Sequence, residues 1–129
     1  MPIHRLVCLV AFLSMFSLGL ACGLSHKVTT RYQETVLHER EAILKEDLTL
    51  MRAAIKHYTS DKKVPPQSLD DLVKAGYLSQ IPVDPITEQR NWRAVVGAYG
   101  SQSRGLNGLV DVRSAAAEKS SGGTPYSEW

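Results

Sequence analysis

Residues 37–58, LHEREAILKEDLTLMRAAIKHY, decide how this chain folds. Apolar side chains recur there at spacings of seven, four, three, four and three: Leu37, Leu44, Leu48, Met51, Ile55 and Tyr58. Side chains three and four positions apart share one face of an α-helix. Most positions between them are polar, and Glu41 and Lys45 are spaced to form an ion pair on that polar surface. The pattern predicts one amphipathic helix over about 28–60.

An uncharged segment lies toward the N-terminus. Residues 6–24, LVCLVAFLSMFSLGLACGL, carry no charge and follow His4 and Arg5. A basic start before an apolar run is typical of a secretory signal or a membrane anchor. No proline or glycine interrupts 24–64, so the helix is expected to continue from this segment. The expected parts are an anchor at 1–24, a long helix at 25–63 and a small head at 64–129.

Both cysteines, Cys8 and Cys22, lie in or beside the apolar run, which leaves no disulfide framework and no haem motif. Cys22 follows small residues and resembles the acylated cysteine of a bacterial lipoprotein, although Gly19 stands where leucine is usual. Cys22 is therefore the candidate lipid-attachment site. The alternative is an uncleaved anchor in which Cys22 is only a small apolar residue. Both alternatives predict a protein tethered to the inner membrane and facing the periplasm, and lipidation also allows an outer-membrane lipoprotein.

The head begins where two prolines, at 65–66, stop the long helix. A second, short helix is expected next, because Ser68 and Asp71 have the spacing of a capping box. Gly76 is placed to end that helix.

Two β-prone runs follow, at 92–96 and 109–113, separated by a stretch rich in Gly, Ser and Asn. They predict a small antiparallel sheet and an α+β fold. Residues 114–125 are expected to form a loose loop, and the aromatic residues of 125–129 are expected to pack on the head.

A family resemblance rests on four blocks, at 47–55, 66–72, 76–78 and 81–85. Over about 40–129 the chain resembles the major pseudopilin of the type II secretion system (general secretion pathway protein G), a type IV pilin-like family. The resemblance implies a pilin-like fold and a structural, non-enzymatic role. It also implies that the partners are further copies of the chain and other secretion-system subunits, assembled into a short periplasmic filament.

The N-terminus departs from that family. The apolar run lacks the glycine-phenylalanine cleavage site and the glutamate of a prepilin. The alternative function is therefore a lipid-anchored periplasmic lipoprotein that uses a pseudopilin-like head as a binding module.

The apolar stripe is the candidate assembly seam, and its members are Leu37, Leu44, Leu48, Met51 and Ile55. Its part toward Met51–Tyr58 is expected to pack on the sheet of the head. Leu37 and Leu44 lie closer to the membrane segment and are the residues expected to face neighbouring subunits.

The resemblance also implies a calcium loop after the second strand. Asp111 and Ser114 are the candidate ligands there, but alanines at 115–117 stand in place of acidic residues. Because calcium takes six to eight oxygen ligands, usually with several carboxylates, this is a poor set. No other cofactor is expected.

Several function classes are disfavoured by composition. The net charge is +2 with both signs interspersed, so no basic face points to nucleic acid. None of the four histidines forms a ligand pair with another, and no nucleophile or phosphate-binding motif occurs. The chain is therefore not expected to be an enzyme or to take a small-molecule substrate.

Overall fold

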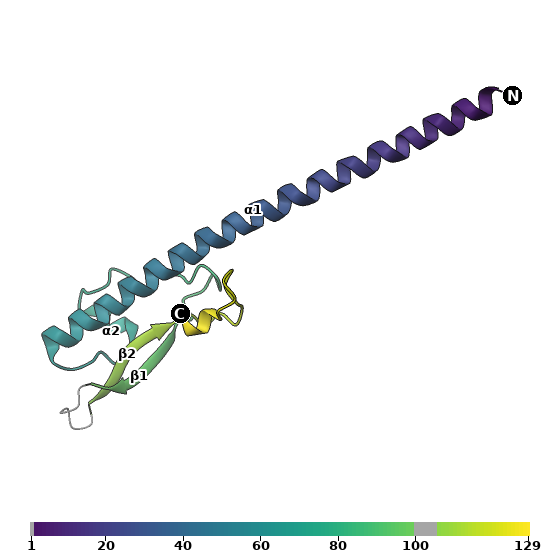
Figure 1. Ribbon diagram of the computed structural model, residues 1–129. Coiled ribbons are helices and arrows are strands. Elements are labelled where there is room, and N and C mark those ends of the chain that lie inside the picture. Colours follow the sequence, from purple (N-terminus) through teal and green to yellow (C-terminus); the bar gives the residue numbers. More distant parts are fainter. Residues whose placement is uncertain (1, 100–105) are drawn as a thin grey trace. The chain divides into compact units, whose positions relative to one another are not determined.

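The structure is a computed structural model that describes the backbone of residues 2–99 and 106–129, and the side chains of 30–99 and 106–129. Figure 1 shows its elements in chain order. They are helix α1 (Pro2–Lys62), helix α2 (Leu69–Lys74), strand β1 (Arg93–Ala98), strand β2 (Asn107–Arg113) and the short 3-10 helix η1 (Tyr126–Glu128). The expected α+β order of a long helix, a short helix and a small antiparallel sheet is confirmed.

The chain divides into two compact units, Met1–Leu37 and His38–Trp129. The expected division placed the long helix and the head in separate parts. Here the last two dozen or so residues of α1 belong to the same unit as the head, because they supply one side of its core.

Helix α1 ends at the predicted place. Its last residue is Lys62, and Lys63 then takes a left-handed conformation with φ 60° while its amide still donates to the Thr59 carbonyl (2.9 Å). Pro65 and Pro66 follow, and neither can extend a helix because proline has no amide hydrogen.

Helix α2 has the predicted capping box. The Asp71 amide donates to Ser68 Oγ (3.3 Å), and Asp71 Oδ2 accepts from the Ser68 amide (3.2 Å). At the other end Gly76 has φ +81°, and the amides of Tyr77 and Leu78 both donate to the Leu72 carbonyl. A left-handed glycine just past the last turn is the expected stop signal.

Strands β1 and β2 pair antiparallel, with a register shift between Val95 and Val96. Strand β2 also bonds to the segment after α1, because the Leu109 amide donates to the Pro66 carbonyl (2.7 Å). The approach is so close that a Cβ on Gly108 would lie 2.6 Å from Pro65 Cγ and 2.7 Å from the Pro66 oxygen. Glycine is therefore required at 108 for the hairpin to sit against the two prolines.

The core of the second unit lies between α1, α2, β2 and the C-terminal segment. Its largest fully buried apolar side chains are Tyr126, Leu44, Leu48, Met51, Leu72, Leu109 and Val112. The prediction that the C-terminal aromatic residues pack on the head is confirmed, since Tyr126 is buried and its ring meets that of Trp129 edge to face at 5.2 Å.

The expectation of a loose loop at 114–125 is wrong. Ser114, Ala116 and Ser120 are buried. The segment also holds its own backbone hydrogen bonds, including Ser120 to Thr124 and Tyr126 to Glu118. Small side chains let this stretch pack closely against its neighbours, so a composition that suggests a loop instead gives an ordered covering of the core.

Candidate interaction site

The predicted assembly seam lies almost wholly inside its own unit. Leu44, Leu48, Met51 and Ile55 are all buried in the core, and Leu44 is 0% exposed. Leu37 is half-buried and is the last residue of the first unit. Leu44 is therefore corrected from a residue facing neighbouring subunits to a core residue. The physical reason is that the chain's own C-terminal segment reaches along α1 as far as Glu41.

Glu41 joins that segment to α1. The residue is 6% exposed, and its carboxylate accepts hydrogen bonds from the Ser121 amide (2.6 Å), Ser121 Oγ (2.6 Å) and Tyr126 Oη (2.9 Å). The expected surface pair of Glu41 with Lys45 is thus wrong. Lys45 instead places its ammonium over the ring of Trp129, 4.6 Å from the centroid.

The contacts of Glu41 shift the pKa of two groups, Glu41 itself and Tyr126. Burial raises the pKa of Glu41, but the hydrogen bonds from Ser121 and Tyr126 outweigh burial, so the pKa lies below its ordinary value. Burial and the bond to Glu41 raise the pKa of Tyr126 to about 12. The carboxylate is therefore held charged by neutral donors, and the exposed His38 imidazole lies 3.6 Å from it.

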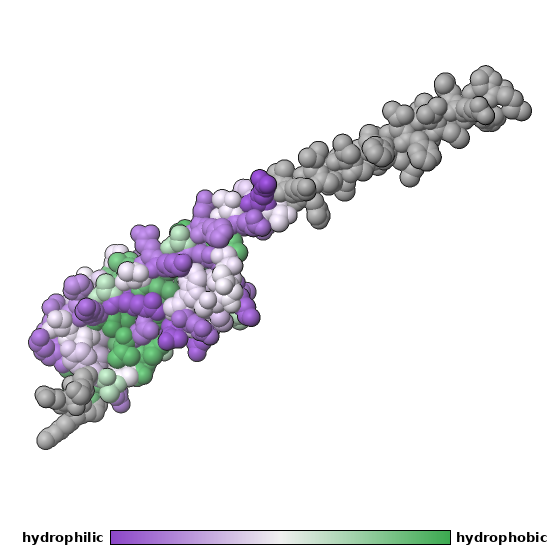
Figure 2. All heavy atoms as spheres, in the orientation of Figure 1, coloured by the Kyte–Doolittle hydropathy of each residue, from purple (hydrophilic) through white to green (hydrophobic). Residues whose placement is uncertain are grey.

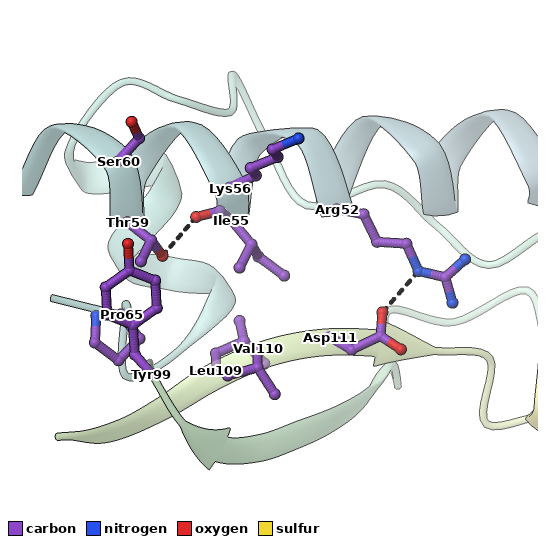
Figure 3. A pocket seen from close by; sticks show the side chains of 10 residues that line it. All are labelled: Arg52, Ile55, Lys56, Thr59, Ser60, Pro65, Tyr99, Leu109, Val110 and Asp111. Atoms are coloured by element: carbon purple, nitrogen blue, oxygen red, sulfur yellow. Dashed lines mark hydrogen bonds and ion pairs between the residues drawn. The ribbon is translucent and has the colours of Figure 1, made fainter. Parts of the chain in front are cut away.

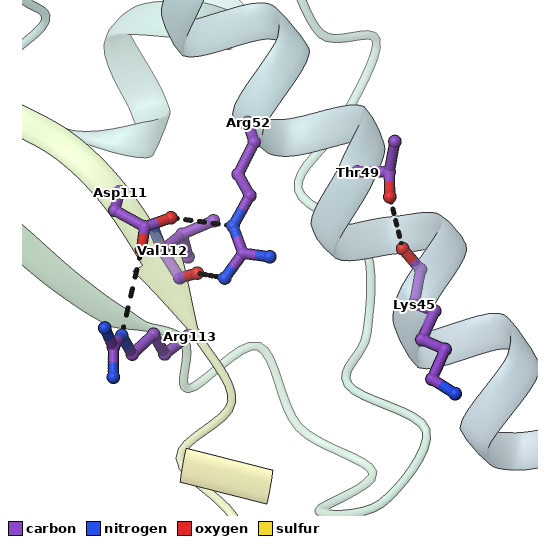
Figure 4. Close-up of polar contacts among 6 residues, drawn as sticks. All are labelled: Lys45, Thr49, Arg52, Asp111, Val112 and Arg113. Atoms are coloured by element: carbon purple, nitrogen blue, oxygen red, sulfur yellow. Dashed lines mark hydrogen bonds and ion pairs between the residues drawn. The ribbon is translucent and has the colours of Figure 1, made fainter. Parts of the chain in front are cut away.

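A second polar contact joins α1 to strand β2 (Figure 4). Arg52 Nε donates to Asp111 Oδ1 (2.7 Å), and Arg52 Nη2 donates to the Val112 carbonyl (3.0 Å). Arg113 Nε approaches the other oxygen of Asp111 at 3.8 Å. Asp111 is half-buried, so this contact is more open to solvent than the one at Glu41.

The two candidate calcium ligands are not brought together. Asp111 faces Arg52, whereas Ser114 Oγ donates to Asp84 Oδ2 at 2.5 Å. Across the part of the chain with described side chains, no group of three or more His, Cys, Asp or Glu residues is arranged to hold a metal. A cation at Asp111 would have to compete with the guanidinium of Arg52.

Asp84 is a buried acid that the sequence pattern did not single out. Besides the hydroxyl of Ser114, it accepts from the amides of Ile86 (2.8 Å) and Thr87 (3.3 Å), and these bonds close a turn that begins at Asp84. The half-buried Asp47 on α1 lies within its electrostatic reach. Burial, Glu46 and Asp84 together raise the pKa of Asp47.

An apolar groove of about 550 Å³ runs between α1 and strand β2 (Figure 3). Ile55 on the helix and Val110 on the strand face each other across it, and the Arg52–Asp111 pair closes one end. Figure 2 shows hydrophobic residues gathered between helix and hairpin on this face, with hydrophilic residues around them. The lining is completed by Lys56, Thr59, Ser60, Pro65, Tyr99 and Leu109.

A second exposed surface lies on α1 itself, away from the core. Ile43 is 50% and Leu50 53% exposed, and the exposed acids Glu39 and Glu46 share their face of the helix at spacings of three and four. Among the described residues, Glu39 and Glu46 have no hydrogen bond or ion pair. We name Glu39, Ile43, Glu46 and Leu50 the acidic helix face.

The predicted lipid-attachment residue Cys22 and the anchor at 6–24 lie outside the described side chains. Within residues 30–99 and 106–129, whose side chains are described, no helix is long and apolar enough to cross a membrane. Comparisons with protein-family models, with curated proteins and with solved structures find no match for this chain. A functional assignment therefore rests on the chain's own residues.

Proposed function

We propose that this chain is a structural, non-enzymatic subunit of a type II secretion pseudopilus-like assembly that supports protein export through the periplasm. The observation that carries the proposal is helix α1, which has 61 residues, while the compact head unit begins only at His38. The described side chains at 30–35 are exposed in the single chain. Long helices are normally stabilised by packing against a partner surface, which further copies would provide.

The sequence supports the same role. The resemblance to the major pseudopilin covers 40–129, and the uncharged segment at 6–24 provides an inner-membrane anchor with the head facing the periplasm. The partners are then other copies of this chain and other secretion-system subunits. Nucleic acid and small-molecule substrates have no part in this function.

The alternative function is a lipid-anchored lipoprotein whose pseudopilin-like head is a binding module. Cys22 favours it, because acylation at this position would replace the spanning segment with a lipid anchor. The head itself is compatible with both functions.

Two measurements on the full chain, purified from membranes, separate these functions. Intact mass and N-terminal sequencing distinguish a retained apolar segment from a chain cut before Cys22 and carrying a diacylglycerol adduct. Sedimentation velocity in mild detergent then tests assembly. A ladder of oligomers supports the pseudopilus subunit, and strictly monomeric protein over a wide concentration range rejects it. Cys22→Ser is the matched control, because it removes the acylation site and leaves the head unchanged.

A further inference from the structure

The head unit carries two exposed surfaces of opposite character. One is the apolar groove between α1 and β2, and the other is the acidic helix face. We infer that the groove of one copy binds the acidic helix face of a second copy of this chain. The inference rests on the proposed function, because it names the contact through which copies of the subunit would assemble.

One of the residues that line the groove carries an unpaired positive charge. Lys56 lines it, is exposed and has no hydrogen bond or ion pair to any described residue. The acid of the groove, Asp111, is already paired with Arg52, so its charge is largely compensated. Among the lining residues the unpaired charge is therefore positive, and Lys56 carries it.

The acidic helix face has the matching properties. Ile43 and Leu50 are two turns apart and offer apolar side chains to a groove whose walls include Ile55 and Val110. Glu39 and Glu46 alternate with them on the same face. In protein interfaces, apolar contacts at the centre contribute affinity, and opposite charges around them fix the orientation of the two partners. The groove and the acidic helix face provide both kinds of contact.

The two surfaces do not overlap, so one copy can use both at once. A contact between unlike surfaces does not close on itself in a pair, and it extends copy by copy unless the rotation happens to form a ring. The centres of the two surfaces are about twelve residues apart on α1, or about 18 Å at 1.5 Å per residue. Parallel copies would therefore be staggered along the helix direction by about that length.

Photo-crosslinking locates the contact. A photoreactive amino acid at Leu50 of the full chain in mild detergent is expected to give intermolecular products whose crosslinked peptides contain Ile55 or Val110. The same amino acid at Asp70, an exposed position on α2, is the control and is expected to give far less product. Products from Leu50 that map elsewhere, while oligomers persist, overturn this inference and leave the proposed function standing.

Charge exchange tests the pairing. Glu46→Lys and Lys56→Glu each place like charges in the contact, so each is expected to weaken self-association about tenfold or more. A chain with both substitutions restores opposite charges between neighbours and is expected to recover most of the loss. Lys74→Glu, on α2, is the matched control.

Sedimentation velocity measures the association, and thermal unfolding checks that each variant is folded. Failure of the double variant to recover overturns the pairing. Monomers only, in the unaltered chain, overturn both this inference and the proposed function.

Discussion

Helix α1 holds two later segments of the chain by different chemistry. At Glu41, a buried carboxylate accepts three hydrogen bonds from uncharged donors of the C-terminal segment. About three turns further toward the C-terminal end of the helix, Arg52 forms a half-exposed ion pair with Asp111 of strand β2. Both contacts join residues far apart in the sequence, yet they depend on different solution conditions.

The difference is one of solvation. A buried carboxylate without its hydrogen bonds would be strongly destabilising, so Glu41 and its donors depend on one another. A half-exposed ion pair is already screened by water and salt, so it contributes less and can be replaced more easily. Acid should therefore loosen the contact at Glu41, whereas salt should weaken the one at Arg52.

The largest effect is expected from the apolar layer that both contacts share. Met51→Ala removes a fully buried side chain and should lower the free energy of unfolding by about 2–5 kcal/mol. Chemical denaturation measures the change, with the exposed His57→Ala as control. If amide hydrogen exchange showed that protection was lost around only one of the two contacts, the idea of a common core would be contradicted.

Glu41→Gln should come next, at about 1–3 kcal/mol near neutral pH, because it weakens the acceptor of three bonds inside the core. The pKa of Glu41 is lowered in the folded state, so its contribution is present above the ordinary value of 4.5 and is lost as pH falls through the folded pKa. The difference in unfolding free energy between the variant and the unaltered chain should therefore be largest at neutral pH and shrink at acid pH, as measured by chemical denaturation at both. A gap that stays constant with pH would reject this origin.

Arg52→Ala should cost about 1 kcal/mol or less, because the pair is partly exposed. Added salt should reduce the difference from the unaltered chain. Arg52→Lys is the matched comparison, since it keeps the charge but cannot reach both Asp111 and the Val112 carbonyl with a planar fork. Equal loss in both variants at every salt concentration would show that geometry, and not charge, dominates.

Asp47→Asn should have the smallest effect and the opposite sign. The pKa of Asp47 is raised by burial, Glu46 and Asp84, so the charge that Asp47 carries at neutral pH is less favourable in the folded state than in the unfolded state. The variant should therefore be slightly more stable at neutral pH, and the gain should vanish as pH falls through the raised pKa. Thermal unfolding over a pH series measures it; a destabilised variant at neutral pH would contradict the assignment.

Local features of the fold were predictable because they depend on neighbours in the sequence. The capping box of Ser68 and Asp71 and the stop at Gly76 are such features. Glu41 was not predictable, because its partner Ser121 is 80 residues away and both are ordinary surface residues by type. The pairing of Arg52 with Asp111, 59 residues away, was missed for the same reason, although Asp111 itself was named as a candidate calcium ligand.

The periodicity of the candidate seam correctly predicted which face of the helix is buried, but it did not predict what covers that face. A stripe of apolar residues fixes which face of a helix is buried, but it does not say whether the covering surface belongs to the same chain. Burial of Leu44 within its own unit shows that the head covers the stripe there. The two surfaces that we propose as the contact between copies, the groove and the acidic helix face, carry a weaker apolar signal in the sequence.

The close approach at Gly108 offers a means of recognising related chains. With Pro65 Cγ and the Pro66 oxygen within 2.7 Å of where a side chain would begin, any chain that keeps the paired prolines must keep glycine here or move its hairpin. Distant relatives should therefore be identifiable by the joint presence of two prolines after a long helix and a glycine two residues into the last strand, even where the rest of the sequence has diverged.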